Sequence, residues 1–471
     1  MDPDRPTTNP FRLLPSVERL AANARDAAQR RGVPAAVLTR LAQGVIEALR
    51  TRLAANEWSG PEFERFVADR GPERELEQAL LREAGAGWVR VVNATGVVLN
   101  TGLGRAPVHP LAAERMAQAA ASYGTLEVER WSGKRNQRDD RISDLMVRLV
   151  GGEAAIAVNN CAAAVLLALQ TFAGGKGCIL SRGELVEIGG SFRMPAVMER
   201  AGVRLVEVGT TNRTRLSDYE SAIDAHTGLV LKVHTSNYRV VGFTEEVSVK
   251  ELAALGRRRA LPVLYDLGSG LVDPAGAVPL DFLDETNTVA GALADGVDAV
   301  MFSGDKLFGG PQAGFIVGRR DTIAALRKNP LYRALRLDKV AIAGIEATLE
   351  IVAQGRADEL PTRRMLITSA EQLQPVAQRV AAAIGACTGC TAAVVPQRSQ
   401  PGSGTAPHVF IDTYCVAATR NGWSAQRLAR ELRHGEPVVF ARIEDDRVLL
   451  DVRTLLPGDE ELLLAAFQRL S

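Results

Sequence analysis

The sequence predicts an α/β protein whose central sheet is mainly parallel, with a helical N-terminal domain and a small α+β C-terminal domain. From about residue 88, short apolar runs alternate with segments long enough for crossover helices. Before them, residues 12–82 show a helical spacing of apolar side chains, and after them helical and strand-like segments are mixed. We place the domains at 1–87, 88–330 and 331–471, in line with a soft expectation of one domain per ~150 residues.

The N-terminal domain is predicted to be a helical bundle. Val17–Gln29 and Ala35–Ala54 place apolar residues three and four apart, which is the period of a helix with one buried face. The first residues lack the apolar core of a signal peptide, and no apolar run reaches the roughly 20 residues of a membrane span. We therefore expect a cytoplasmic protein.

The strands of the other two domains are predicted from short apolar runs bounded by turn residues. Those of the central domain are Ala154–Val158, Gly177–Leu180, Arg204–Val208, Leu229–Val233, Pro262–Tyr265, Asp298–Phe302 and, after a Gly-rich turn, Gln312–Gly318. Those of the C-terminal domain are His408–Ile411, Val438–Ile443 and Arg447–Val452, followed by the helix Asp459–Leu470. The glycine-, serine- and glutamine-rich segment Gln397–Ala406 predicts a flexible loop.

Composition limits the classes of function. The formal net charge is +1, so contact with nucleic acid would have to use local patches. The five cysteines form an odd, sparse set, which indicates a reducing compartment rather than a disulfide framework. Cys387 and Cys390 form a C-x-x-C pair without a second pair, so we expect no metal site.

The strongest chemical signal is Met301–Gly310, with the sequence MFSGDKLFGG. An apolar strand ends there in Lys306, and glycines beside it would let a flat ring approach the backbone. The chain has only seven lysines, so few compete for a Schiff-base role. Lys306 is therefore the candidate for covalent attachment of pyridoxal 5′-phosphate (PLP), although a lysine in a surface loop would look the same in isolation.

Asp266 is the second signal, in LPVLYDLGSG, 40 residues before Lys306. PLP acts as an electron sink when its ring nitrogen is protonated, and an aspartate beside that nitrogen keeps the proton there. Strand carboxyl ends are also where open α/β sheets hold ligands. An aspartate that caps the turn before Gly268 is the alternative.

A phosphate cup is predicted where an apolar strand runs into an alanine-rich helix, in AIAVNNCAAAVLLAL. Free N–H groups at a helix N-terminus suit a phosphate. Asn160, Cys161 and Ala162 are the candidates, and Ser303 could add a hydroxyl; an ordinary Asn-capped helix is the alternative. Asn237 follows another strand and could bind the ring hydroxyl of PLP, while the nearby His234 is expected to be structural.

Three arginines are candidates for binding an anion. Arg105 stands in the Gly-rich segment TGLGRAP. Arg333 and Arg336 are three residues apart, which would put them on one face of a helix. A pair of guanidinium groups suits an oxyanion, and solvated helix charges are the alternative.

Several long motifs resemble those of the bacterial L-seryl-tRNA(Sec) selenium transferases, or selenocysteine synthases. The motifs are VNATGVVLNTGLGRAPV, VNNCAAAVLLAL, SRGELVEIGGSFRMP, VGTTNRT, KVHTSNYRVVGFTEEV, DLGSG, SGDKLFGGPQAG and ARIEDDRVLLDVRTLLPGDEE. The resemblance runs from about residue 11 to the end and implies the aspartate-aminotransferase-like fold of PLP enzymes, fold type I. It implies Lys306 as the PLP lysine and Asp266 as the partner of the ring nitrogen. Cys161 departs from the family pattern, in which alanine or asparagine is expected.

The resemblance also implies a function. A seryl ester on tRNA(Sec) would displace Lys306 from PLP, lose water to give an aminoacrylyl-tRNA, and accept selenium from selenophosphate. Arg105, Arg333 and Arg336 would then bind selenophosphate. The family forms a decamer, a pentamer of dimers, and its helical domain grips tRNA(Sec), here residues 1–80.

Two alternatives remain open at this point. A PLP-dependent lyase of the same superfamily, acting on a small amino acid or an amino sugar phosphate, would share Lys306 and Asp266 but would not need residues 1–80. A PLP-free RNA-binding or scaffold protein would show no visible absorbance and no lysine trapped by borohydride. The near-neutral net charge argues against the second alternative, since general RNA binders tend to be basic.

Overall fold

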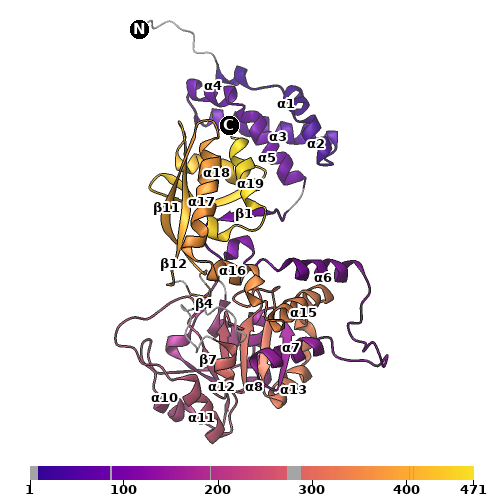
Figure 1. Ribbon diagram of the computed structural model, residues 1–471, viewed down its shortest axis with the longest axis vertical. Coiled ribbons are helices and arrows are strands. Elements are labelled where there is room, and N and C mark those ends of the chain that lie inside the picture. Colours follow the sequence, from indigo (N-terminus) through magenta and orange to yellow (C-terminus); the bar gives the residue numbers. More distant parts are fainter. Residues whose placement is uncertain are drawn as a thin grey trace. The chain divides into compact units, whose positions relative to one another are not determined.

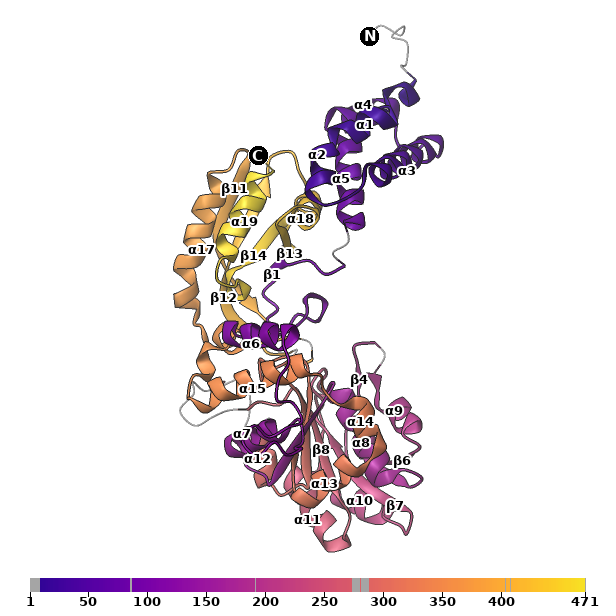
Figure 2. The ribbon, with the colours of Figure 1, turned by 90° about the vertical axis from the view of Figure 1, so that its right-hand side faces the viewer.

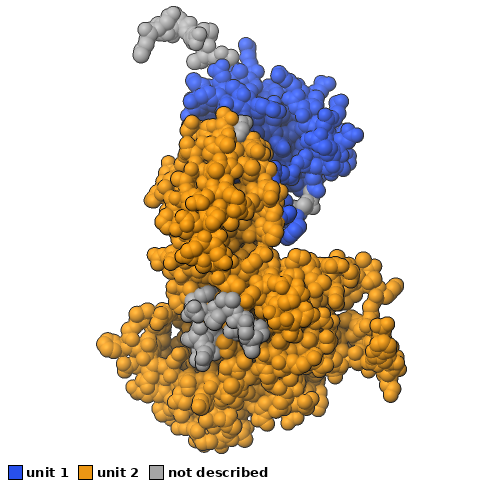
Figure 3. Space-filling view, in the orientation of Figure 1, with its two compact units in different colours: residues 1–91, 431–438 blue, residues 92–430, 439–471 orange. Residues whose placement is uncertain are grey.

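The computed structural model describes residues 9–84, 87–190, 192–272, 280, 288–402, 404–406 and 408–470. The chain divides into two units, which Figure 3 shows in different colours. The first unit contains residues 1–91 and 431–438, and the second contains residues 92–430 and 439–471. Each unit has hydrophobic clusters of its own, so each has an independent source of stability.

The first unit is helical (Figure 1). Its helices are α1 (Val17–Asn23), α2 (Arg25–Arg30), α3 (Ala35–Ala54), α4 (Gly60–Ala68) and α5 (Gly71–Glu83). The predicted helix Ala35–Ala54 is α3, whereas the predicted helix Val17–Gln29 is divided at Ala24 between α1 and α2. The apolar spacing puts one face of each main helix into a shared core, which includes Leu20, Leu38, Ile46, Leu49, Leu76 and Leu80.

The central sheet of the second unit confirms the mainly parallel arrangement. Its seven strands lie in the order β2-β10-β9-β8-β7-β3-β6. Neighbours from β9 to β6 are parallel, and β10 is antiparallel to both β9 and β2. The strands are β2 (Ala154–Val158), β3 (Gly177–Ser181), β6 (Arg204–Val208), β7 (Thr227–Val233), β8 (Val263–Gly268), β9 (Ala299–Ser303) and β10 (Gly314–Gly318).

Helices cover both faces of this sheet (Figures 1 and 2). Alternate side chains of each strand enter opposite clusters: Ala155 and Ala157 of β2 lie in one, and Ile156 and Val158 lie in the other. The first cluster contains residues of α7 (Asp140–Val150), α10 (Leu216–Ala222), α11 (Val249–Arg259), α12 (Val289–Ala294) and α15 (Lys339–Ala353). The second contains residues of α8 (Cys161–Ala173), α9 (Met194–Arg200), α13 (Arg320–Lys328) and α14 (Pro330–Leu335).

A second sheet has the strand order β1-β13-β14-β12-β11. Its strands are β1 (Val91–Ala94), β11 (Cys390–Ser399), β12 (Ile411–Arg420), β13 (Val438–Glu444) and β14 (Arg447–Asp451). Helix α17 (Ala370–Gly385) contacts β11, β12 and α19 (Asp459–Gln468), which gives the α+β character expected of the C-terminal region. The predicted strands Val438–Ile443 and Arg447–Val452 correspond to β13 and β14.

Two strand assignments in this region differ from the sequence analysis. The predicted strand His408–Ile411 is wrong at its start, because β12 begins only at Ile411. β11 was not predicted, and it includes Gln397–Ser399, the first part of the segment expected to be a loop. Among the described residues, no helix is both long enough and apolar enough to cross a membrane.

Candidate active site

Lys306 lies in a tight turn after the carboxyl end of β9. The turn is closed by backbone hydrogen bonds from Gly304 N–H to Ala313 O (2.8 Å), from Gly309 N–H to Lys306 O (2.9 Å) and from Gly310 N–H to Gly304 O (2.9 Å). The lysine is only 7% exposed, and its Nζ donates to the carbonyl oxygen of Gly404 at 3.2 Å. The predicted position at a strand end is confirmed, and the alternative of a lysine in a solvent-exposed loop is excluded by this burial.

Asp266 lies on the neighbouring strand β8, also near its carboxyl end. The side chain is 5% exposed, and burial raises the pKa of its carboxyl group to about 6. Its Oδ1 accepts hydrogen bonds from the Cys161 thiol (3.5 Å) and from the Gly268 N–H (3.1 Å), and these bonds oppose the rise in pKa. A positive charge placed next to this buried carboxyl group would therefore favour its ionised form.

The charge of Lys306 is disfavoured by the same surroundings. Burial lowers the pKa of its amine, and the Arg105 guanidinium lowers it further, while Cys161, Asp266 and Asp305 act in the opposite direction. A neutral amine is the nucleophilic form that condenses with an aldehyde. The environment of Lys306 therefore favours a covalent role over a permanent surface charge.

The predicted phosphate cup lies at the start of α8. The Asn160 side chain caps the helix by accepting from the Ala163 N–H (2.9 Å), as the capping alternative expects, and the phosphate cup stays a prediction. Cys161 turns its sulfur toward Asp266, and burial raises the pKa of its thiol, followed by the effect of the Asp266 charge. The thiol therefore stays protonated and can donate. Ala162 is exposed at this helix end, and Ser303 is buried at the end of β9.

Strand β10 comes very close to the cup. A Cβ atom added at Gly314 would collide with the Asn160 carbonyl group and would lie 2.8 Å from the Cys161 nitrogen. Only glycine fits at this position, because any side chain would push the start of α8 away from the sheet. The position of the cup therefore depends on Gly314.

Asn237 brings a third strand end to the site. Its Nδ2 donates to the carbonyl oxygen of Glu187 at 2.6 Å, which ties the segment after β7 to the hairpin of β4 (Glu187–Ile188) and β5 (Phe192–Arg193). Its Oδ1 and the hydroxyl of its neighbour Ser236 are buried without a hydrogen-bond partner among the described residues. Such atoms are rare in folded proteins and indicate a missing ligand or water.

A cavity of about 280 Å³ is lined by Lys306 and Asn237, but not by Asp266 or the start of α8. Arg105 lies in its wall, with a left-handed backbone (φ 63°), and its Nη1 is 2.8 Å from Oδ2 of Asp305, the residue before Lys306. The described wall consists of Leu99, Thr101, Arg105, Ile188, Gly189, Asn237, Lys306, Gly404 and Thr405. Of these residues, the sequence analysis named only Arg105, Asn237 and Lys306 as site candidates. The motif TGLGRAP contains one missed residue, whereas Gly404 and Thr405 come from the segment predicted as a flexible loop.

The other two predicted arginines do not line this cavity. Helix α14 ends at Leu335, and Arg336 has an extended backbone that forms a bridge with Val158 of β2, so the prediction of two arginines on one helix face is wrong. The backbone is extended there because Arg336 pairs with Val158, the last residue of β2, in an antiparallel bridge. The Arg336 guanidinium lies 3.6 Å from Glu127, and Arg333 is exposed.

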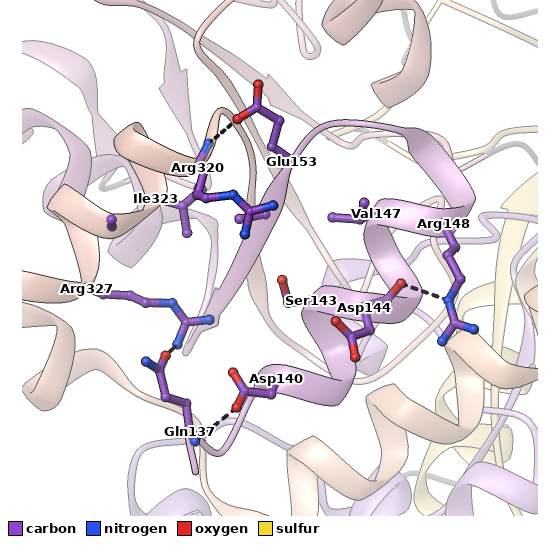
Figure 4. A pocket seen from close by; sticks show the side chains of 12 residues that line it. Gln137, Asp140, Ser143, Asp144, Val147, Arg148, Glu153, Arg320, Ile323 and Arg327 are labelled. Atoms are coloured by element: carbon purple, nitrogen blue, oxygen red, sulfur yellow. Dashed lines mark hydrogen bonds between the residues drawn. The ribbon is translucent and has the colours of Figure 1, made fainter.

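A larger cavity of about 930 Å³ lies between α7 and α13 and contains none of the predicted site residues. Figure 4 shows that its polar side chains largely bind one another or nearby backbone groups. Glu153 accepts from the backbone N–H of Arg320 at 3.0 Å, and Arg148 donates to the carbonyl oxygen of Asp144 at 3.0 Å. The described lining of this cavity contains no lysine, so the predicted PLP site is considered at the cavity beside Lys306.

The residues around Lys306 fit PLP. The site combines a buried amine with a lowered pKa, a buried carboxyl group with a raised pKa and the N-terminus of a 13-residue helix. The unpartnered Oδ1 of Asn237, in the wall of the same cavity, is an acceptor that a ring hydroxyl could satisfy. No group of three or more metal-binding side chains occurs in the described part of the chain.

Comparison with known protein families gives a match over most of the chain. Residues 91–456 match the family described as L-seryl-tRNA selenium transferase. Two curated relatives carry the name L-seryl-tRNA(Sec) selenium transferase. The one from Moorella thermoacetica is 48% identical over 405 residues, covering 84% of this chain and 85% of the relative. The one from Solidesulfovibrio magneticus is 42% identical over 465 residues, covering 97% of both chains.

Among solved structures, the chain resembles D-glucosaminate-6-phosphate ammonia-lyase. The TM-score is 0.56 at 25% sequence identity, and the match covers 81% of this chain and 96% of that one. The fold is therefore shared, over most of the chain, with an enzyme of different name, so the fold by itself does not decide the substrate.

Proposed function

Because this chain belongs to the L-seryl-tRNA selenium transferase family, we propose that it converts L-seryl-tRNA(Sec) to L-selenocysteinyl-tRNA(Sec), with selenophosphate as the selenium donor. The observation that carries the proposal is the family match over residues 91–456 together with the buried Lys306 at the carboxyl end of β9. The substrate is inferred from the names of the relatives, and the buried lysine is the group that could bind the cofactor needed to activate it.

Lys306 is proposed to hold PLP and to move the proton of the seryl Cα. Bound PLP supplies an electron sink for the negative charge that develops when this proton leaves. The lowered pKa of the Lys306 amine keeps a fraction of it neutral, which the role of base requires. The Gly404 carbonyl oxygen orients the amine by accepting its hydrogen bond at 3.2 Å.

The other predicted residues are proposed to position the cofactor. Asp266 would hold the proton on the ring nitrogen, and Asn237 would bind the ring hydroxyl. Asn160, Cys161 and Ala162 would offer N–H groups to the phosphate from the start of α8, with the Ser303 hydroxyl beside them. The support for these roles is the burial of Asp266 and the collection of all these residues at the carboxyl ends of β2, β7, β8 and β9.

The arginines are proposed to bind selenophosphate. A seryl ester has no free α-carboxylate, so an anion-binding group in this site is available for the selenium donor. Arg105 is supported by its position in the cavity wall. Arg333 and Arg336 remain candidates on the resemblance, and Arg336 is near the phosphate cup through the bridge to Val158.

The wider assembly is also part of the proposal. The helical domain, residues 1–87, would bind tRNA(Sec); residues 88–330 would hold PLP, and residues 331–471 would form the small domain. A homodecamer built as a pentamer of dimers and a cytoplasmic location follow from the resemblance and from the substrate. Light scattering of the purified protein tests the oligomer, with about ten chains per particle as the expected result.

The direct test of the proposed function is product formation. Purified protein is incubated with PLP, seryl-tRNA(Sec) and selenophosphate, and the aminoacyl group is analysed for selenocysteine. Wild type should form selenocysteinyl-tRNA, and omission of either PLP or selenophosphate should abolish it. Absence of product under conditions where tRNA(Sec) binds would refute the proposal.

Lys306→Ala is the matching variant. It should lose the visible absorbance of bound cofactor and the cofactor–lysine adduct trapped by borohydride, because the reacting amine is gone. Lys339→Ala is the control, since Lys339 Nζ is exposed and donates to the carbonyl oxygen of Ser122. A Lys306→Ala protein that still gave a borohydride-trapped lysine would assign the linkage elsewhere.

The lyase alternative has one structural observation in its favour, the likeness to D-glucosaminate-6-phosphate ammonia-lyase. The identity of 25% to that enzyme is much lower than the 41–48% to the transferases, so the transferase proposal is preferred. Ammonia release from an amino sugar phosphate, measured beside the tRNA reaction, separates the two functions.

A further inference from the structure

A short loop from the C-terminal part of the chain lies against the reactive amine. We call Gly402, Gly404, Thr405 and Ala406 the glycine–threonine loop. Its Gly404 carbonyl oxygen accepts the hydrogen bond from Lys306 Nζ, and an added Cβ at Gly404 would lie 3.4 Å from that nitrogen. Thr405 is in the wall of the same cavity. The loop therefore touches the place where the reacting group must bind.

The loop is held in position by the backbone around it. The N–H groups of Val98 and Leu99 donate to the carbonyl oxygens of Gln400 and Pro401, both at 2.9 Å. Within the loop, the Thr405 and Ala406 N–H groups donate to the Gly402 carbonyl oxygen at 3.2 and 3.3 Å. These bonds hold the loop beside Lys306, and the Thr405 hydroxyl takes part in none of them.

The Thr405 hydroxyl has no hydrogen-bond partner in the described part of the chain. The residue is 4% exposed, and its Oγ1 is buried without a hydrogen bond to any described residue. Leaving a buried hydroxyl without a hydrogen bond destabilises the folded protein. A valine of the same shape would avoid this cost, so the stability of the cofactor-free protein does not explain a threonine here.

In the proposed reaction the seryl group displaces Lys306 from the cofactor, so the freed amine can again donate to the Gly404 carbonyl oxygen. The Thr405 hydroxyl is the side-chain group of the loop that remains without a partner among the described residues. A hydroxyl can both donate and accept a hydrogen bond. The seryl β-hydroxyl is carried on the carbon next to the Cα whose proton Lys306 is proposed to move, so it would lie near this amine, where the Thr405 hydroxyl can pair with it.

We propose that the glycine–threonine loop recognises the seryl group, with the Thr405 hydroxyl binding the seryl β-hydroxyl while the Gly404 carbonyl oxygen keeps the Lys306 amine oriented. The inference rests on the proposed function and adds the element that selects serine. A site built to pair with a hydroxyl discriminates strongly against a substrate that lacks it, because its own polar group is then left unpaired. Thr405 is thus a residue that determines specificity for the aminoacyl group.

The test compares Thr405→Val with Thr405→Ser in the full-length, PLP-loaded enzyme. The KM for seryl-tRNA(Sec) is measured beside the inhibition constants of alanyl-tRNA(Sec) and uncharged tRNA(Sec). Thr405→Val should raise the KM at least tenfold and change both inhibition constants less than twofold. Thr405→Ser keeps the hydroxyl and should stay within about threefold of wild type in all three constants.

Thermal unfolding of the cofactor-free proteins gives a second readout. Thr405→Val should unfold at the same temperature as wild type or higher, because it removes a buried unpaired hydroxyl and retains the volume. An unchanged KM for seryl-tRNA(Sec) in Thr405→Val would overturn the inference. An equal loss of affinity for all three RNAs would also overturn the inference, since that result would indicate a general disturbance of the protein.

The inference and the proposed function fail in different ways. If the proposed function is wrong, wild type forms no selenocysteinyl-tRNA, and the inference falls with it. If only the inference is wrong, wild type is active and Thr405→Val matches it in KM. Visible absorbance of bound PLP, measured in both variants, ensures that a change in KM is not a loss of cofactor.

Discussion

At the scale of single residues, burial shifts the pKa values of Asp266 and Lys306 in the directions that disfavour their charged forms. Burial raises the pKa of the Asp266 carboxyl to about 6 and lowers the pKa of the Lys306 amine. A bound ligand could stabilise each group: the neutral amine can form a covalent bond with it, and the carboxylate can pair with a cationic group on it. Opposed shifts of this kind are common where acid and base chemistry share one site.

The raised pKa of Asp266 makes a prediction about the stability of the cofactor-free protein. A carboxyl pKa above its usual 3.8 means that burial opposes ionisation, so the folded chain loses stability as pH rises from 3.8 to about 6. The loss corresponds to about 3 kcal/mol at most. Asp266→Asn should therefore unfold at a higher temperature than wild type at pH 8 in the absence of PLP.

The pH dependence distinguishes this effect from general stabilisation. The advantage of Asp266→Asn should shrink as pH falls from 8 to 5, because wild-type Asp266 then takes up its proton. With PLP present the order should reverse, since the variant lacks the carboxylate that pairs with the ring nitrogen. A stability gain that is independent of pH would show that the carboxyl group is not the cause.

At the scale of secondary structure elements, the predicted site residues that the structure brings to one edge of the sheet share one property. Lys306, Asp266, Asn160 and Asn237 each follow a short apolar run, and parallel strands bring their carboxyl ends to one edge of the sheet. The strand β2 was predicted with its observed bounds, because five consecutive apolar residues, four of them buried, leave a clear signal. Local sequence was therefore sufficient to predict which residues meet there.

The parts that were missed depend on contacts far along the chain. Gly404 and Thr405 belong to a segment without periodicity, and its order comes from pairing with Val98 and Leu99 about 300 residues earlier. β11 was missed because it is an edge strand with mixed exposure and contains Pro396, which sheets tolerate at their edges. Neither feature leaves a local pattern that could have been recognised.

The contact between β10 and the start of α8 predicts a specific loss of cofactor binding. Gly314→Ala would push the Asn160 carbonyl away from the sheet and displace the N–H groups of the cup. We expect the affinity for PLP, measured by fluorescence titration, to fall at least tenfold, which corresponds to about 1.4 kcal/mol. The protein should also become less stable, because the backbone must shift.

Gly318→Ala is the matched control on the same strand. A Cβ atom there would collide with the Asp298 carbonyl oxygen, at the end of β10 away from the cup. It should reduce stability by a similar amount and leave the affinity for PLP within about threefold of wild type. Equal loss of affinity in both variants would mean that general destabilisation, and not the cup, governs cofactor binding.

At the scale of the whole molecule, the net charge of +1 conceals an uneven distribution in the helical unit. Residues 12–54, which include α1 to α3, contain eight arginines and three acidic residues. Residues 55–84, which include α4 and α5, contain four arginines and eight acidic residues. RNA binding depends on local positive charge, so the α1–α3 segment is the better candidate for contact with tRNA.

This asymmetry predicts which arginines the tRNA needs. Arg25 and Arg30 on α2 are exposed, and replacing both with glutamate should lower the affinity for tRNA(Sec) at least tenfold and reduce its dependence on salt. Replacing Arg65 of α4 and Arg82 of α5 with glutamate makes the same change in net charge within the acidic segment and should alter the affinity less than threefold. Binding is measured by filter retention at several salt concentrations, with PLP absorbance as the check that the second unit is intact. Equal losses in the two double variants would mean that overall charge, rather than the α1–α3 segment, attracts the RNA, whereas no loss in either would remove the helical unit from the tRNA contact.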